Sequence, residues 1–164
     1  MADWKFQDET LGLQPIAETS TTKRHPLGTI KRATHETYGA GEFIYLLGVA
    51  STAVGSFAVY NADDFGTTLL IADQIGPVGI AMSANVASQY GWYQIHGKAV
   101  GVAAAIADNG NVYATATPGS VDDVVVAGDL VHGAKAASAT ASGVADFEIA
   151  RPWVDNDLDD LDVS

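Results

Sequence analysis

The sequence predicts an all-β protein: a small antiparallel β-barrel or sandwich with an extended N-terminal arm and an acidic C-terminal tail. From residue 41 onward, short runs rich in Val, Ile, Tyr and Phe alternate with Gly, Asn, Asp and Pro, a pattern typical of many short strands. No segment keeps a helical stripe of apolar residues over three turns. We therefore divide the chain into an arm (1–40), a body (41–154) and a tail (155–164).

The arm is polar and shows little periodicity before Leu27. Residues 1–26 cannot bury enough apolar surface to fold alone, so we expect them to be extended, and the whole arm to be mobile in the free protein. A frayed terminus without a role is the alternative. Several large apolar side chains argue against it because they need a partner surface; these are Trp4, Phe6, Leu11, Leu13 and Ile16.

The body contains short β-type runs separated by turn residues. The strongest hairpin signal is Asp108-Asn109-Gly110, which we expect to join a strand ending near Ile106 to the next strand. Residues 84–91 are compatible with one short turn of helix. The candidate strands are 42–49, 56–61, 67–73, 77–83, 92–103, 111–117, 123–127, 129–135 and 145–152.

Charge is scarce and unevenly placed. Charged residues make up 17% of the chain, against about a quarter in an average soluble protein. This suggests a surface covered by sister subunits or a larger assembly, or alternatively a compact β protein with small residues at its turns. The net charge is −12, and residues 33–164 hold three basic residues against sixteen acidic ones, a net of −13. Such a body repels phosphate backbones, so we expect no nucleic-acid partner.

Composition also disfavours membrane and secreted proteins. The longest apolar runs, 43–50 and 99–107, are far shorter than the roughly 20 residues that cross a bilayer, so we expect no membrane partner. The first ten residues lack a basic segment followed by an apolar run, so we expect no secretion signal and synthesis in the cytoplasm. The absence of cysteine excludes disulfides and thiolate chemistry.

No motif typical of catalysis or of phosphate binding occurs in the chain. The acidic pairs Asp63-Asp64 and Asp122-Asp123 lie in predicted loops, where turn hydrogen bonding explains them better than a calcium site or a glycosidase pair. We therefore expect a protein that is not an enzyme, with no catalytic residue, metal or cofactor. The histidines are too widely separated for a typical metal site; they are His25, His35, His96 and His132.

One strand carries a notable set of polar and aromatic side chains. In Trp92 to Val100, alternate residues face opposite sides. Tyr93, Ile95 and Ala99 suit a core, and Gly97 lets another backbone approach closely. The other face would form an outer contact row for a partner, because no general base with an orienting group accompanies it; this row is Trp92, Gln94, His96 and Lys98.

Three stretches carry a resemblance to a known family: GPVGIAMSANVASQYGWYQIHGKAVG, DNGNVYATATPGSVDD and AGDLVHGAKAAS. They resemble the capsid decoration proteins (cement or head-stabilising proteins) of tailed bacteriophages. The similarity covers roughly Leu27 to Asp155. It implies a structural virion protein on the outside of an icosahedral shell, made in the host cytoplasm, that cements neighbouring major capsid subunits.

The resemblance also implies partners and contact residues. The partners are the major capsid protein and further copies of the chain, with a trimer favoured among homo-oligomers. We expect the apolar arm residues named above to dock on the shell. Basic residues of the arm would face acidic groups of capsid subunits; they are Lys23, Arg24, Lys31 and Arg32.

Two other classes of function stay open. A carbohydrate- or receptor-binding module displayed on the virion is one, in which Trp92, Trp153 or Tyr90 would stack on a sugar or a surface group. A small β-barrel enzyme with a dispersed site is the other.

Overall fold

A computed structural model describes residues 3–8 and 11–158. It confirms the all-β prediction: the described residues form strands joined by turns and loops, without a helix. At 84–91, the segment compatible with a helical turn instead forms a tight turn in which Gln89 N–H donates to the Val86 carbonyl oxygen at 3.1 Å. The strands are β1 (Lys5–Phe6), β2 (Ile30–His35), β3 (Gly39–Leu47), β4 (Phe57–Tyr60), β5 (Thr67–Leu69), β6 (Gly76–Ala81), β7 (Tyr90–Val102), β8 (Asn111–Ala114), β9 (Val121–Asp122), β10 (Leu130–Ala136) and β11 (Val144–Val154).

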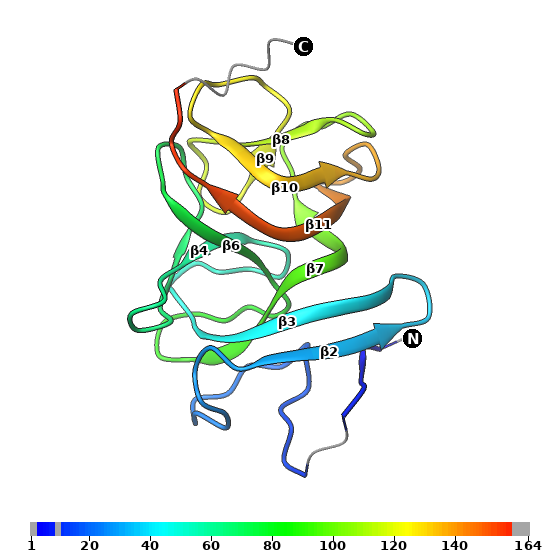
Figure 1. Cartoon of the computed structure of the whole chain (residues 1–164), viewed down its shortest axis with the longest axis vertical. Coiled ribbons are helices and arrows are strands. Elements are labelled where there is room, and N and C mark those ends of the chain that lie inside the picture. Colours follow the sequence, from blue (N-terminus) through cyan, green and yellow to red (C-terminus); the bar gives the residue numbers. More distant parts are fainter. Residues whose placement is uncertain (1–2, 9–10, 159–164) are drawn as a thin grey trace.

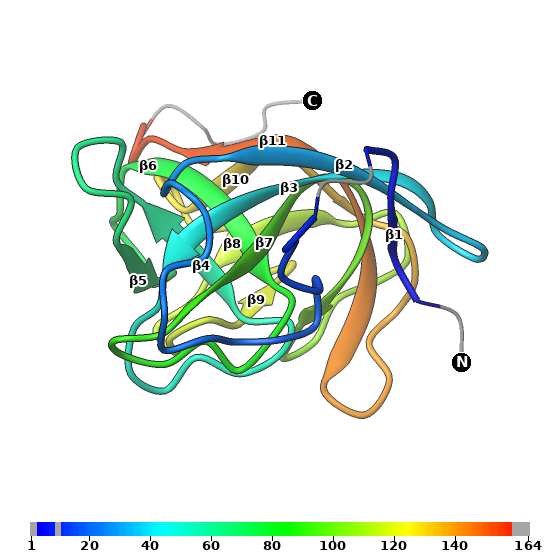
Figure 2. The ribbon, with the colours of Figure 1, turned by 90° about the horizontal axis from the view of Figure 1, so that it is seen from below.

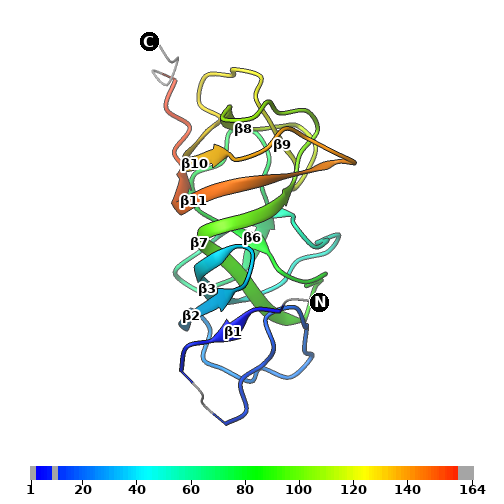
Figure 3. The ribbon, with the colours of Figure 1, turned by 90° about the vertical axis from the view of Figure 1, so that its right-hand side faces the viewer.

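The named strands pair antiparallel in the order β1-β2-β3-β7-β6-β11-β10-β8-β9, with β4 joined to β5 and β6. The sheet is strongly bent but not closed into a barrel, so the sandwich-like alternative describes it better. Figure 1 shows β2 and β3 towards one end of the long axis and β8, β9 and β10 towards the other. Figure 3 shows β7 and β11 between these two ends.

Strand β7 connects the two ends because it changes partner along its length. Its first half pairs with β3, up to His96, and its second half pairs with β11, from His96 onward. At the change, Gly97 has φ +101°, and a Cβ there would lie 2.5 Å from the Ala40 carbonyl oxygen. The interpretation of Gly97 as a point of close backbone approach is confirmed.

The predicted hairpin at residues 108–110 is wrong. A turn forms there, with Gly110 N–H donating to the Ala107 carbonyl oxygen at 3.0 Å. The flanking strands, however, do not pair: β8 pairs with β9 and β10. The second half of β7 is instead paired with β11, whose register runs from Val144 opposite Val102 to Ala150 opposite His96. Strand β11, which is distant in the sequence, is therefore paired with β7 where the predicted hairpin would have placed β8.

The boundary at residue 40 does not separate two structural units. Strands β2 and β3 form a hairpin across it, with His35 opposite Gly39 and Ile30 opposite Ile44. Strand β1 then adds to the outer edge of β2. The arm thus contributes two strands to the same sheet as the body. Residues 159–164 of the predicted tail lie outside the described residues.

The buried residues form groups at both ends of the molecule. At the end with β8–β11, the core surrounds Phe57 and Phe147, whose rings meet edge to face at 5.1 Å between centroids. At the end with β2 and β3, Ile16 of the arm packs with Phe43, Tyr45 and Trp92. The second group contains Trp92 of β7, the strand on which the sequence predicted an outer contact row.

Candidate binding surfaces

The aromatic face of β7 is covered by the arm. Figure 2 shows the N-terminal segment crossing the end of the molecule that carries β3 and β7. The Phe6 ring lies 5.5 Å from the Trp92 ring between centroids. Trp92 Nε1–H donates to the Gln14 carbonyl oxygen at 2.8 Å, and Tyr45 O–H donates to Gln14 Oε1 at 2.7 Å. The arm is therefore packed on its own body through a fully buried polar contact.

This packing corrects the predicted outer row. Trp92 and Gln94 are fully buried, so neither lies on an outer face. Gln94 Nε2 instead donates to the carbonyl oxygens of His96 and Lys98, at 3.1 and 3.0 Å, where β7 bends. His96 is exposed, and Lys98 forms an ion pair with Asp146 at 3.0 Å. Period two identified the faces of the strand but could not reveal that both faces are covered from Gly91 to Ile95, while His96 stays exposed.

The five apolar arm residues differ in how deeply they are buried. Ile16 is buried, and three others are partly buried against the same cluster as Trp92; these are Trp4, Phe6 and Leu13. Only Leu11, among the five, is fully exposed. Docking of these residues on a shell stays a prediction; in this conformation four of the five pack at least partly on the protein's own body. The body itself supplies the apolar partner that they need.

The basic arm residues lie at the same end of the molecule as the covered strand. Lys23, Arg24 and Arg32 are exposed, and Lys31 is half-buried. Lys31 and Arg32 are on β2, while Lys23 and Arg24 precede it. Arg24 and Lys31 both lie near His25, whose pKa they lower, whereas Arg32, the next residue on β2, faces the other side of the strand and lies in register opposite Glu42. We call these four residues the basic end.

A different kind of surface lies at the opposite end. The loop before β10 presents three consecutive exposed valines, Val124, Val125 and Val126, with 59%, 56% and 44% of their surface accessible. Figure 1 places this loop at the far end of the long axis from the arm. Asp122 Oδ1 accepts from Val124 N–H at 3.0 Å, which fixes the start of the loop. We call these three residues the valine loop.

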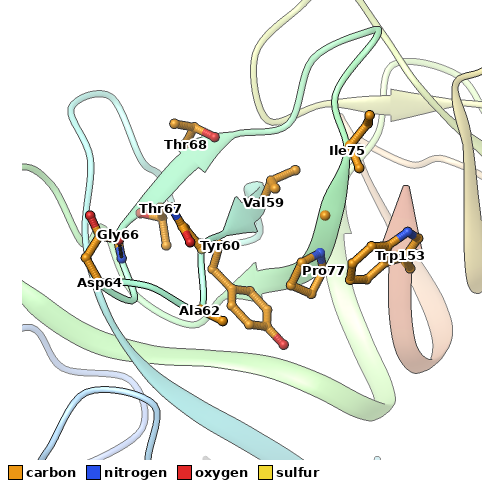
Figure 4. A pocket seen from close by; sticks show the side chains of 12 residues that line it. Val59, Tyr60, Ala62, Asp64, Gly66, Thr67, Thr68, Ile75, Pro77 and Trp153 are labelled. Carbon is orange, nitrogen blue, oxygen red and sulfur yellow. Dashed lines mark hydrogen bonds between the residues drawn. The ribbon is translucent and has the colours of Figure 1, made fainter. Parts of the chain in front are cut away.

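A groove with aromatic residues on one side lies beside the β4–β6 ladder and has a volume of about 620 Å³. Trp153 of β11 pairs with Pro77 of β6, and β6 pairs with β4, which ends at Tyr60. Figure 4 shows the Tyr60 ring, the Pro77 ring and the Trp153 indole along one side of the groove. Burial raises the pKa of Tyr60, an effect that the nearby positive charge of Arg151 partly opposes. We call this the Trp153 groove.

The other side of the Trp153 groove is polar. Asn61, Asp64, Thr67 and Thr68 line it. Asp64 Oδ1 accepts from Gly66 N–H at 2.9 Å, and Thr67 Oγ1 donates to the Leu47 carbonyl oxygen at 2.8 Å. The sequence named Trp153 as a possible stacking residue, but nothing in the linear pattern indicated that Tyr60 and Pro77 would lie beside it.

Within residues 3–8 and 11–158, no group of three or more His, Asp or Glu side chains is placed to hold a metal ion. That same part of the chain forms no helix long and apolar enough to cross a membrane. Asp63-Asp64 lies in a turn, as predicted, and Asp64 accepts a local backbone hydrogen bond. Asp122 instead ends β9 and accepts from Val124 N–H, and Asp123 accepts from the N–H of distant Ala107, so the loop prediction is wrong for Asp122. The chain matches no protein-family model, and no curated protein or solved structure shows significant similarity to it.

Proposed function

We propose that the protein is a structural virion component that binds the outside of an icosahedral phage shell and cements neighbouring major capsid subunits. The single observation that carries this proposal is the presence of two unlike contact surfaces at opposite ends of the long axis. A protein that joins neighbouring subunits needs two separated contact surfaces. The basic end and the valine loop meet that requirement, and the resemblance of three stretches to decoration proteins supports the same function.

The valine loop would supply most of the affinity in this proposal. Burying one large apolar side chain contributes roughly 1.5–3 kcal/mol. The loop is already folded and held at its start by Asp122, so the ordering cost on binding is smaller than for a mobile arm. This replaces the expectation that the arm's own apolar residues dock on the shell.

The basic end would supply orientation. Each exposed ion pair contributes only about 0 to 1 kcal/mol, and such pairs weaken as salt rises. The cations at this end would face acidic groups of a capsid subunit. Those acidic groups would repel the acidic remainder of the molecule, so the basic end would point towards the shell. Association of several copies, favoured here as a trimer, would raise the effective concentration of each contact.

The test is co-sedimentation with purified expanded shells of the phage that encodes the protein. We expect the intact protein to co-sediment. The triple variant V124S/V125S/V126S should bind at least about tenfold more weakly, because about 1.4 kcal/mol of lost apolar burial already corresponds to that factor. The double variant K23Q/R24Q should bind more weakly at low salt and show a smaller dependence on salt than the intact protein.

Two controls separate these effects from general damage. Val54 is 64% exposed outside the valine loop, so Val54→Ser should leave shell binding unchanged. Lys135 is half-buried on β10 and forms an ion pair with Glu148, so Lys135→Gln should also leave shell binding unchanged. The proposal fails if the intact protein does not co-sediment with the shells. A mass-spectrometric inventory of virions is an independent test: many copies per capsid agree with decoration, whereas a handful per virion contradicts it.

A further inference from the structure

We propose that the Trp153 groove binds a neutral oligosaccharide. This inference does not depend on the capsid function: it rests on the shape and lining of one groove, which lies apart from both the basic end and the valine loop. It also decides which of the three aromatic residues that the sequence offered for stacking on a sugar is available. Trp92 is fully buried, and Tyr90 packs against the Tyr45 ring, so Trp153 is the remaining stacking residue.

The groove has an apolar side formed by rings. Trp153 is 44% exposed and the adjacent Ile75 is 64% exposed, although both are large apolar residues that a folded chain usually covers. The ladder places Trp153 directly opposite Pro77, and Figure 4 shows Tyr60 next to Pro77. Aromatic rings in a binding groove offer an apolar face together with a polar edge. The carbon-bound hydrogens on one face of a pyranose ring make such a surface its natural partner.

The polar side of the groove matches the hydroxyl groups of a sugar. Asp64 Oδ1 already accepts a hydrogen bond from Gly66 N–H, which fixes the carboxylate while its second oxygen can still accept. Asn61 Oδ1 accepts from Asp63 N–H at 2.8 Å, so its amide group can donate to a ligand. Thr68 Oγ1 accepts from Gln74 Nε2 at 3.3 Å and keeps a hydroxyl hydrogen to donate. The polar residues of the groove therefore offer both donors and acceptors to a ligand.

Charge selects a neutral ligand. The carboxylate of Asp64 lines the groove and that of Asp63 is adjacent, in a molecule of net charge −12. The nearby cation Arg151 forms an ion pair with Glu42 at 3.2 Å. These carboxylates would repel an anionic sugar, and Arg151 is already paired and would not neutralise its charge. A neutral sugar would meet no such repulsion. The volume of about 620 Å³ falls within the range of small-molecule sites, roughly 300–1,000 Å³.

The experiment is titration of the full-length protein with four neutral hexasaccharides: maltohexaose, cellohexaose, laminarihexaose and chitohexaose. Binding is followed by isothermal calorimetry and by intrinsic tryptophan fluorescence. We expect at least one of them to bind and to change the fluorescence of the exposed Trp153. Trp153→Ala should weaken that binding at least about tenfold, and Asp64→Asn or Thr68→Ala should weaken it several-fold. Val144→Ala, an exposed apolar change elsewhere on β11, is the matched control and should leave binding unchanged.

Each alternative outcome overturns the proposal. The proposal fails if none of the four hexasaccharides binds. It also fails if the folded Trp153→Ala and Thr68→Ala variants bind a saccharide as tightly as the intact protein does. Binding of a proline hexapeptide without binding of any saccharide would assign the groove to a peptide instead. Trp153→Ala should still co-sediment with shells, and the valine-loop variant should still bind saccharide. Failure of this inference is therefore distinguishable from failure of the proposed capsid function.

Discussion

The indole N–H of Trp92 donates a 2.8 Å hydrogen bond to the backbone carbonyl oxygen of Gln14, a residue 78 positions earlier in the chain. The side chain of Gln14 is itself buried and bonds Tyr45 O–H and the carbonyl oxygens of Glu18 and Tyr90. One glutamine thus connects the arm to both β3 and β7. The arm is held by a specific polar contact as well as by apolar packing.

Replacing Gln14 should loosen the arm. Gln14→Ala leaves the hydroxyl of Tyr45 and the carbonyl of Tyr90 without this buried partner, and such losses cost about 1–3 kcal/mol. We expect the free energy of unfolding in urea to fall by that amount and the amide hydrogens of residues 11–28 to exchange faster. Gln7→Ala, at an exposed position of the arm, should change stability by no more than about 0.5 kcal/mol. Equal urea midpoints for the two variants would contradict this role of Gln14.

Acid should loosen the same contact through His25. The backbone N–H of Gln14 donates to His25 Nε2 at 3.0 Å, which requires a neutral imidazole. Burial lowers the pKa of His25, and the positive charges of Lys31 and Arg24 lower it further. The unfolded chain therefore takes up the proton first. The stabilisation is fully present above about pH 6.5 and is lost as the pH falls from there through the lowered native pKa.

The measurement is amide hydrogen exchange of the arm together with urea unfolding, between about pH 7.5 and about pH 5. His25→Gln can offer an amide oxygen as acceptor but does not titrate, so the pH dependence of arm exchange should become shallower than in the intact protein. His96→Gln, at an exposed position on β7, should leave that dependence in place. An identical pH dependence in the intact protein and in His25→Gln would refute the assignment.

Core packing at the other end should be sensitive at Gly101. A Cβ there would lie 2.5 Å from a ring carbon of Phe57 and 3.0 Å from one of Phe147. We expect Gly101→Ala to destabilise the fold by about 1–3 kcal/mol, because a close-packed core absorbs an extra methyl group poorly. In Gly66→Ala the closest atom is the carboxylate oxygen of exposed Asp64, at 3.1 Å, so a shift of a few tenths of an ångström at the surface accommodates the methyl group. Urea unfolding should show a smaller loss for that variant; the reverse order would contradict this account of the core.

We expect a homo-oligomer, with a trimer favoured, and the run 99–107 motivates that prediction. The structure places Val100 on an exposed part of β7, and Val144 of β11, also exposed, lies opposite Val102. If subunits meet on this face, Val100→Asp should shift the protein towards the monomer in light scattering, because a buried unpaired charge is costly. Val125→Asp, in the valine loop, should leave the oligomer intact. A monomeric intact protein at high concentration would refute the prediction.

The strand content was predictable from sequence because it depends on local patterns. Period-two alternation and turn residues identified most of the β regions, but the candidate strand at 123–127 is wrong because those residues form a loop, and β1 and β2 were not among the candidates. Gly97 was recognisable as a point of close approach because a missing side chain has few other uses within a strand. The partners of those strands were not predictable. The turn at 108–110 has the residues of a hairpin, yet β11 pairs with β7 there, because pairing depends on which edge a distant strand reaches.

The sequence by itself determined the chemical character of the candidate surfaces: a cationic N-terminal region, an acidic body and a set of aromatic residues without catalytic motifs. Only the tertiary structure decided which of those residues are accessible. Trp92 and Trp153 look alike as single letters, but the arm covers Trp92 while Trp153 remains at the wall of a groove. Burial is a property of contacts between segments far apart in the chain, so no window of neighbouring residues contains it.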